Sequence, residues 1–189
     1  MAIAVPPNID NTQHGVIGID PVPYDITKRI LALSGTHKHS DGRVKQSGSY
    51  QKVVNIREVD TYVIHEKETW LDEFLVSTAV HANQTFNYNI SGLLERPQLL
   101  RYRAPSNGYN WHTDLGVGDA STRKISITIL LNGAFTGGEF ITFSEGEHHI
   151  PINPCEGIAF SSFIPHKVNK VTKGERWALV AWIAGPSFV

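Results

Sequence analysis

Apolar and polar residues alternate with a period of two over much of the second half of the chain. The clearest stretch is 123–131, where isoleucines at 125, 127 and 129 alternate with lysine, serine and threonine. This period is typical of a strand with one face in a hydrophobic layer. Turn residues bound the other strands that we predict, at 98–103, 109–114, 139–143, 147–152, 157–163, 166–171 and 176–184. Many short strands without a helical period predict a mainly β domain, either a sandwich or a jelly roll.

A helical period is found before these strands. Apolar positions recur every three or four residues from Thr69 to about Phe86, and Thr69 with Asp72 resembles a capping box. We therefore predict an amphipathic helix that flanks the β layers. The β-branched residues between Gln51 and Ile64 favour one or two strands before it.

The first 48 residues have a different composition. They contain four prolines and many glycine and polar positions, which predicts a loose N-terminal arm that packs on the domain without forming its core. The remainder, 49–189, is expected to form a single domain. A chain of 189 residues of which 41% are hydrophobic is long enough for one core and too short for two.

The net charge and the cysteine content limit the classes of binding partner and the cellular compartment that we expect. The net charge of −1 and the pI near 6.7 give no field that would gather nucleic acid or an anionic membrane, so we expect neither as a partner. Small-molecule or peptide partners fit better. Cys155 is the only cysteine, and no long apolar run or cleavable signal opens the chain. These features favour a cytoplasmic protein.

Two histidines and an aspartate are the candidate metal ligands. His112 and Asp114 lie two residues apart, so on a strand both side chains point to the same face. Together with the distant His166 they would give two imidazoles and one carboxylate, the set typical of non-haem Fe(II) oxygenases, which leaves positions open for co-substrates. A single histidine among nine is more often an ordinary surface or core residue, so the prediction depends on the combination.

Arg176 follows His166 by ten residues. If residues 171–175 form a hairpin turn, Arg176 pairs near residue 169, about 10 Å from His166. A guanidinium at that distance could bind the far end of a five-carbon dicarboxylate whose near end is on the metal. The alternative is a solvated strand residue. The solvated position is disfavoured because Arg176 shares its strand face with apolar side chains. A charge buried on that face would need a partner of opposite charge.

Five segments together resemble a known family. They are Tyr109 to Asp114, Ile125 to Asn132, Gly137 to Phe140, Pro165 to Val168, and Lys173 to Trp177. Over residues 50–185 the chain is similar to the Fe(II)- and 2-oxoglutarate-dependent dioxygenases of the prolyl 4-hydroxylase class, particularly the small bacterial and phage hydroxylases. The resemblance implies a double-stranded β-helix (jelly roll) with flanking helices, in which His112, Asp114 and His166 bind iron.

The same resemblance implies a pocket for the co-substrate. Arg176 would bind the C5 carboxylate of 2-oxoglutarate, Tyr102 would line the pocket, and the Thr128 hydroxyl would help to hold the carboxylate. An edge tyrosine and a strand threonine also need no functional explanation. The implied cofactors are Fe(II), 2-oxoglutarate and O2, with ascorbate as a further candidate, and the implied reaction is hydroxylation of a prolyl residue in a peptide or protein.

Other functions remain open at this point. The substrate of such an oxidoreductase could be a free amino acid or another small metabolite. A cupin-like binding module would use a similar barrel without turnover. Such a module normally has further metal-ligating residues in the region that corresponds to 112–120, where this chain has no further histidine and no glutamate. Nucleic-acid demethylases carry a second arginine where this chain has Trp182. We expect residues 50–64 and 116–122 to frame the open side of the metal, with 116–122 either a lid or an ordinary loop.

Overall fold

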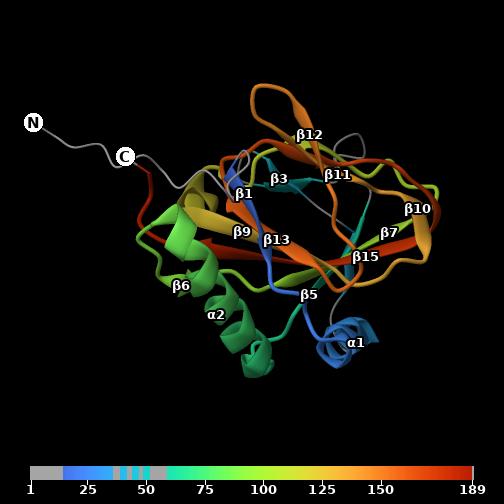
Figure 1. Cartoon of the computed structure of the whole chain (residues 1–189), viewed down its shortest axis with the longest axis horizontal. Coiled ribbons are helices and arrows are strands. Elements are labelled where there is room, and N and C mark those ends of the chain that lie inside the picture. The colour runs from blue at the N-terminus through green and yellow to red at the C-terminus, as the bar shows by residue number, and fades with distance from the viewer. Residues whose placement is uncertain (1–14, 36–38, 42–43, 47–48, 52–58, 189) are drawn as a thin grey trace, which may run out of the picture.

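The protein consists of two antiparallel β-sheets that face each other, with two helices on the outer side of the larger sheet (Figure 1). A computed structural model describes residues 15–35, 39–41, 44–46, 49–51 and 59–188. The larger sheet contains, in spatial order, β1 (Val16–Ile19), β13 (Gly157–Ser161), β9 (Arg123–Leu130), β15 (Val171–Ala184), β7 (Gln98–Arg103), β5 (Asp60–Val63) and β2 (His39–Asp41). β6 (Gly92–Leu93) and β10 (Phe135–Gly137) also pair with β15.

The smaller sheet has the order β12 (Glu147–Ile150), β11 (Phe140–Phe143), β14 (His166–Val168) and β8 (Tyr109–His112). A separate ribbon pairs β3 (Val44–Gln46) with β4 (Ser49–Gln51). From β8 to β15 the chain passes back and forth between the two sheets. This is the predicted jelly roll, and the fold class is confirmed.

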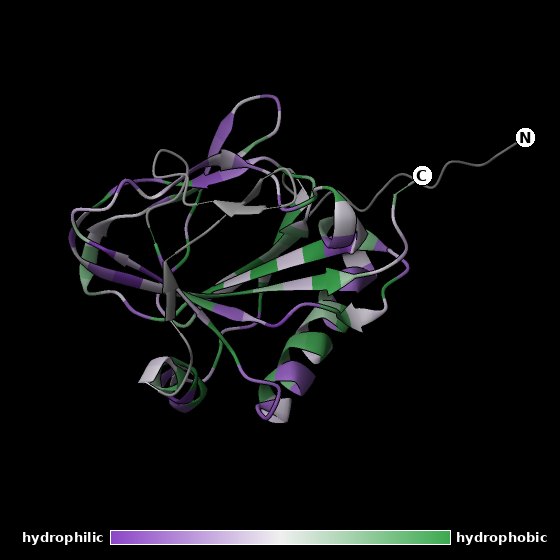
Figure 2. Ribbon diagram, turned by 180° about the vertical axis from the view of Figure 1, so that it is seen from behind, coloured by the Kyte–Doolittle hydropathy of each residue, from purple (hydrophilic) through white to green (hydrophobic). Residues whose placement is uncertain are grey.

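Helix α2 (Thr69–Phe86) has the predicted bounds and packs on the larger sheet. Four of its residues, Leu71, Leu75, Ala79 and Ala82, are at most 1% exposed. In Figure 2 hydrophobic positions alternate along the long strands of the sheet that faces this helix. The predicted capping box is wrong. Glu68 is the N-cap without a side-chain cap bond, and Asp72 instead accepts two hydrogen bonds from Arg96.

The described part of the N-terminal arm contributes to the core, which corrects our expectation. β1 extends the larger sheet beside β13, and Val22, Ile30 and Leu33 are buried in the main hydrophobic cluster. The proline-rich stretch had indicated a loop, but Pro23 is the N-cap of helix α1 (Tyr24–Ala32), a position near the helix start that proline tolerates. Residues 1–14 lie outside the described part, and the domain boundary near 48 remains a prediction.

A single long strand replaces the predicted hairpin at residues 171–175. β15 runs without interruption through this region in the larger sheet, whereas β14 lies in the smaller one. Gly174 had suggested a turn. Its role is close approach, since a Cβ atom there would lie 2.2 Å from the Ala134 carbonyl oxygen. Arg176 consequently pairs with Tyr102 of β7 and not with residue 169.

The strands predicted between Gln51 and Ile64 are found in part. β5 begins at Asp60, and residues 52–58 lie outside the described part of the chain. Neither described helix combines the length and hydropathy that crossing a bilayer requires.

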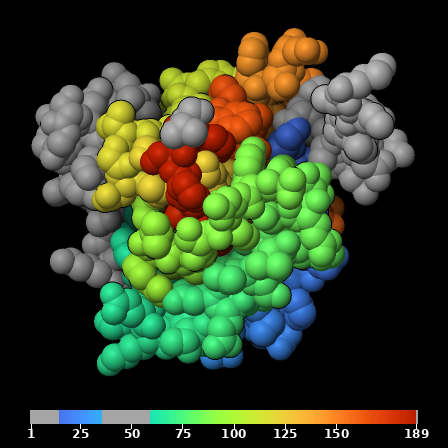
Figure 3. Space-filling model, turned by 90° about the vertical axis from the view of Figure 1, so that its left-hand side faces the viewer, coloured from blue at the N-terminus to red at the C-terminus, as the bar shows by residue number. Residues whose placement is uncertain are grey.

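The C-terminal tail is fixed against the end of the larger sheet. Its Phe188 ring makes edge contacts with Tyr88 and Phe163, at centroid distances of 5.8 and 6.0 Å. The Lys124 ammonium lies 3.3 Å from the same ring centroid. Figure 3 shows this red segment between the yellow and green surfaces of the chain. The tail therefore braces the start of β9, the strand that carries one wall of the site.

Candidate metal centre and adjoining pocket

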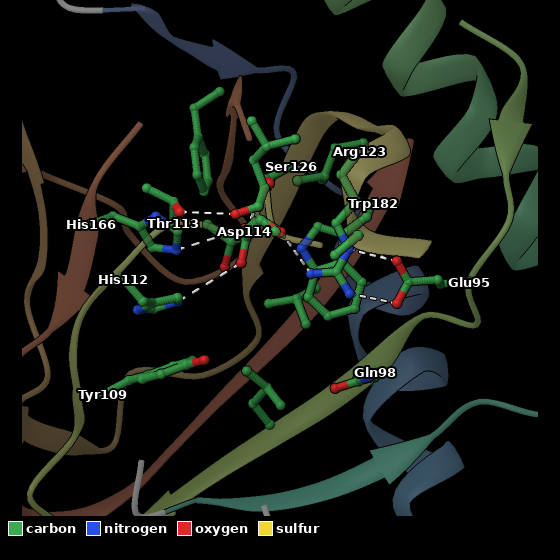
Figure 4. Close-up of a pocket in the computed structure, with 18 of the residues that line it drawn as sticks. Glu95, Gln98, Tyr109, His112, Thr113, Asp114, Arg123, Ser126, His166 and Trp182 are labelled. Carbon is green, nitrogen blue, oxygen red and sulfur yellow. Dashed lines mark hydrogen bonds and ion pairs between the residues drawn. The ribbon is translucent and has the colours of Figure 1, made fainter. Parts of the chain in front are cut away.

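His112, Asp114 and His166 converge at one end of the smaller sheet (Figure 4). His112 ends β8, and His166 begins β14 directly opposite it in the antiparallel pair. One ligand atom from each residue lies within 4.8 Å of the others. Asp114 Oδ1 is 3.8 Å from His112 Nε2, and Asp114 Oδ2 is 3.7 Å from His166 Nε2. Three candidate ligands therefore surround one point, as metal binding requires.

Both imidazoles are oriented by backbone carbonyls. The His112 Nδ1 atom lies 2.8 Å from the Asn110 oxygen, and His166 Nδ1 lies 2.9 Å from the Ile164 oxygen. A carbonyl only accepts, so each Nδ1 carries the proton and donates it. Nε2, the atom that remains to bind a metal, then faces Asp114 in both rings. This arrangement fixes the tautomer that a first-row metal needs.

Asp114 is held as a carboxylate. Burial alone raises the pKa of its carboxyl group, but the nearby His166 and His112, a hydrogen bond from Ser126 and the charge of Arg123 outweigh burial and leave the pKa below its ordinary value. Its side chain is 11% exposed. The Arg123 guanidinium also donates to its backbone oxygen at 3.1 Å. The donor set available to a metal is therefore two imidazole Nε2 atoms and one carboxylate, which fits Fe(II).

Aromatic rings enclose the two imidazoles. Tyr109 stacks on His112 with ring centroids 3.5 Å apart. Phe140 and Phe160 lie 5.4 and 4.8 Å from the centroid of His166. These contacts restrict rotation of the ligands and exclude water from one side. Sequence patterns do not reveal such a role, because an aromatic residue in a strand has the same pattern whether it packs in a core or beside a ligand.

A cavity of about 550 Å³ adjoins the triad and also reaches Arg176, Tyr102 and Thr128. Arg176 and Tyr102 are opposite each other on β15 and β7, and Thr128 on β9 faces Val180 of β15. The structure thus brings all six predicted site residues to one cavity. The position of Arg176 in the fold differs from the prediction. It reaches the cavity from the larger sheet and not from a hairpin next to His166.

Arg176 is a buried cation that lacks a counter-ion among the described residues. The residue is 3% exposed, and within the described part of the chain its Nε atom has no hydrogen-bond partner. Burial lowers the pKa of its guanidinium, and the neighbouring Tyr102 partly offsets this. An unpaired buried charge costs free energy unless an anion joins it. This orphaned donor therefore fits the remote carboxylate of a bound dicarboxylate.

A second arginine forms the wall of the cavity beside Asp114. The Arg123 guanidinium binds both carboxylate oxygens of Glu95 and lies 4.0 Å from the ring centroid of Trp182. Gln98 lies on the same side (Figure 4). This pair was not predictable from the sequence, because Glu95 and Arg123 are 28 residues apart and no local spacing connects them.

The loop after Asp114 closes one side of the cavity. Residues 113–120 line it, and the chain then forms a 3-10 turn at Gly118–Thr122. Val117 at its tip is 91% exposed. The loop therefore has the location expected of a lid, and its movement remains a prediction.

Gly138 sets the position of Arg176. Its φ is +71°, and a Cβ atom there would lie 2.7 Å from Arg176 Cδ. We expect Gly138→Ala to displace the guanidinium and to raise the 2-oxoglutarate concentration needed for half-maximal binding by about 10- to 100-fold. Titration of the metal-loaded protein with 2-oxoglutarate measures this.

Gly92→Ala is the matched control, because Gly92 also has positive φ but open space around its Cα. It should lose stability without losing 2-oxoglutarate affinity. Equal affinity losses in the two variants would mean that the effect comes from backbone strain and not from contact with Arg176.

Comparison with known proteins links this geometry to a family. Residues 97–184 match the 2OG-Fe(II) oxygenase superfamily. A PKHD-type hydroxylase of Thermosynechococcus vestitus is 30% identical over 144 residues, which are 72% of this chain and 63% of that protein. The chain therefore spans less than two thirds of that relative. The matched region includes all six residues of the predicted site.

Solved structures share the fold. A Pseudomonas putida prolyl-4-hydroxylase superposes with a TM-score of 0.73 at 18% identity, covering 92% of this chain and 94% of that one. A Trichoplax adhaerens prolyl hydroxylase, in complex with a hypoxia inducible factor peptide fragment, superposes with a TM-score of 0.72 at 20% identity, covering 92% and 84%. At these identities the likeness is one of fold.

Proposed function

We propose that the protein is an Fe(II)- and 2-oxoglutarate-dependent dioxygenase that hydroxylates a C–H bond, and the match of residues 97–184 to the 2OG-Fe(II) oxygenase superfamily supports this. One observation carries the proposal. The convergent His112, Asp114 and His166 side chains share a cavity with the buried Arg176 guanidinium, whose Nε atom lacks a partner among the residues that the structure describes. A dicarboxylate that chelates the metal at one end would place its other carboxylate at the guanidinium.

The roles of the side chains follow from this geometry. His112, Asp114 and His166 would hold Fe(II), and Arg176 would bind the C5 carboxylate of 2-oxoglutarate, with Tyr102 and Thr128 beside it. Bound Fe(II) supplies the chemistry that converts 2-oxoglutarate, O2 and a substrate C–H bond to succinate, CO2 and a C–OH group. The protein contributes orientation and exclusion of water through Tyr109, Phe140 and Phe160.

We propose a prolyl residue in a peptide or protein as the substrate. The support is the similarity to proteins described as prolyl hydroxylases, one of them in complex with a peptide. A free amino acid or small metabolite is the alternative, because a structural neighbour in nogalamycin biosynthesis, at a TM-score of 0.65, is described as an epimerase. A cupin-like module without turnover is the remaining alternative.

A succinate assay tests the proposal. Protein supplied with Fe(II), 2-oxoglutarate and O2 should release succinate slowly alone and several-fold faster with a proline-containing peptide. The same peptide with alanine in place of proline should leave the background unchanged. Parallel reactions with and without ascorbate test that predicted cofactor.

The same experiment separates the alternatives. Stimulation by a free amino acid and not by the peptides would overturn the prolyl assignment and retain the dioxygenase. Metal binding without succinate under any condition would favour the binding module. If the loop 116–122 is a lid, its amide hydrogen exchange should slow when 2-oxoglutarate and the peptide are both present.

A further inference from the structure

Two buried serines connect to the carboxylate of Asp114. Ser126 Oγ donates to Asp114 Oδ2 at 2.6 Å, and Ser162 Oγ lies 3.0 Å from Ser126 Oγ. Ser126 is 1% exposed and Ser162 is fully buried. Neither hydroxyl belongs to a candidate metal ligand, although Ser126 lines the cavity, so the role of this hydrogen-bonded pair is still to be explained.

The direction of these hydrogen bonds follows from the protons that are available. An ionised carboxylate only accepts, so Ser126 gives its one proton to Asp114. Ser162 must then be the donor to Ser126. The result is a chain from Ser162 through Ser126 to Asp114 in which each bond polarises the next.

The serines connect the two sheets at the metal end. Ser126 lies on β9 opposite Phe160 of β13, both in the larger sheet, whereas the histidine ligands lie in the smaller one. The backbone oxygen of Ser162 accepts hydrogen bonds from Asp114 N and Leu115 N, and its own N–H donates to Lys124 O. The main chain and the side chain of Asp114 are therefore both tied to the same pair of strands.

We propose that Ser126, supported by Ser162, is a positioning residue. Its hydrogen bond engages Oδ2 of Asp114, the oxygen on the side of His166, and favours Oδ1 as the one oxygen offered to the metal. A carboxylate can bind a metal through one oxygen or both. Binding through both would take a position that the co-substrates need. This inference rests on the proposed function, because it assumes that the triad binds a metal.

Co(II) binding to the metal-free, full-length protein tests the proposal without turnover. Calorimetry should show Ser126→Ala binding Co(II) about 10- to 100-fold more weakly than the parent, the range usual for loss of a partner to a metal ligand. Ser162→Ala should show a smaller loss. Ser126→Thr keeps the hydroxyl, so this variant should bind Co(II) more tightly than Ser126→Ala.

Ser161→Ala is the matched control. Ser161 is adjacent to Ser162 and 3% exposed, and its hydroxyl bonds to the Tyr88 hydroxyl at 2.8 Å instead of to the Asp114 chain. The same substitution there removes a buried hydrogen bond but leaves Asp114 untouched. Its Co(II) affinity and the visible absorption spectrum of its bound Co(II) should match the parent, whereas the Ser126→Ala spectrum should change.

The outcomes distinguish this inference from the proposed function. If the parent does not bind Co(II), the metal site itself is wrong. If the parent binds and Ser126→Ala has the same affinity and spectrum, the positioning role is wrong. If Ser126→Ala does not fold, the comparison rests on the other variants, and equal affinities for Ser162→Ala and Ser161→Ala would overturn the proposal.

Discussion

Replacing His166 with alanine is expected to abolish metal binding and succinate formation together. His166 is buried, and its Nε2 atom faces the Asp114 carboxylate. Without it only one imidazole and one carboxylate remain. The loss of Co(II) affinity should exceed roughly 100-fold, the upper range for removing only an outer partner of a ligand. Calorimetry on the metal-free protein measures the affinity, and the succinate assay measures turnover.

His148→Ala is the control for this experiment. His148 lies on β12 of the same sheet, outside the cavity, and its Nε2 contacts the Ser144 backbone oxygen. The variant should bind Co(II) like the parent. Parental Co(II) affinity in His166→Ala would show that the three side chains do not form the metal site.

Local spacing explains which features the sequence could predict. The spacing of His112 and Asp114 predicted a shared strand face. The two side chains do converge, but β8 ends at His112 and Asp114 lies just beyond the strand. Helix α2 was predictable because its apolar period extends over 18 residues. Helix α1 has only 9 residues and follows a proline-rich stretch, so turn signals obscured it.

Local sequence patterns could not predict which strands pair with one another. Arg176 does reach the predicted cavity, but through β15 and β7 and not through a hairpin with β14. The glycine at 174 has the same signature in a turn as in a strand that another backbone approaches closely. The contacts of Ser126 with Asp114 and of Arg123 with Glu95 join residues that come together only when the two sheets have formed.

Arg176→Ala should raise the 2-oxoglutarate requirement strongly and leave metal affinity nearly unchanged. Loss of a charge-assisted contact to a carboxylate, which then stays unpaired, should cost on the order of 2 to 4 kcal/mol. That corresponds to roughly 30- to 1,000-fold in affinity. Titration of Co(II)-loaded protein with 2-oxoglutarate measures the change. Arg103→Met is the control, since Arg103 lies on neighbouring β7 but is exposed and paired with Glu175.

Stability gives an independent test of the same role. A buried guanidinium without an anion costs free energy, so Arg176→Met should be at least as stable as the parent when 2-oxoglutarate is absent. Added 2-oxoglutarate should raise the melting temperature of the metal-loaded parent and not that of the variant, because a ligand stabilises only the state that binds it. A large stability loss in Arg176→Met, with metal and 2-oxoglutarate affinities reduced equally, would make Arg176 a structural residue and remove the dicarboxylate from the site.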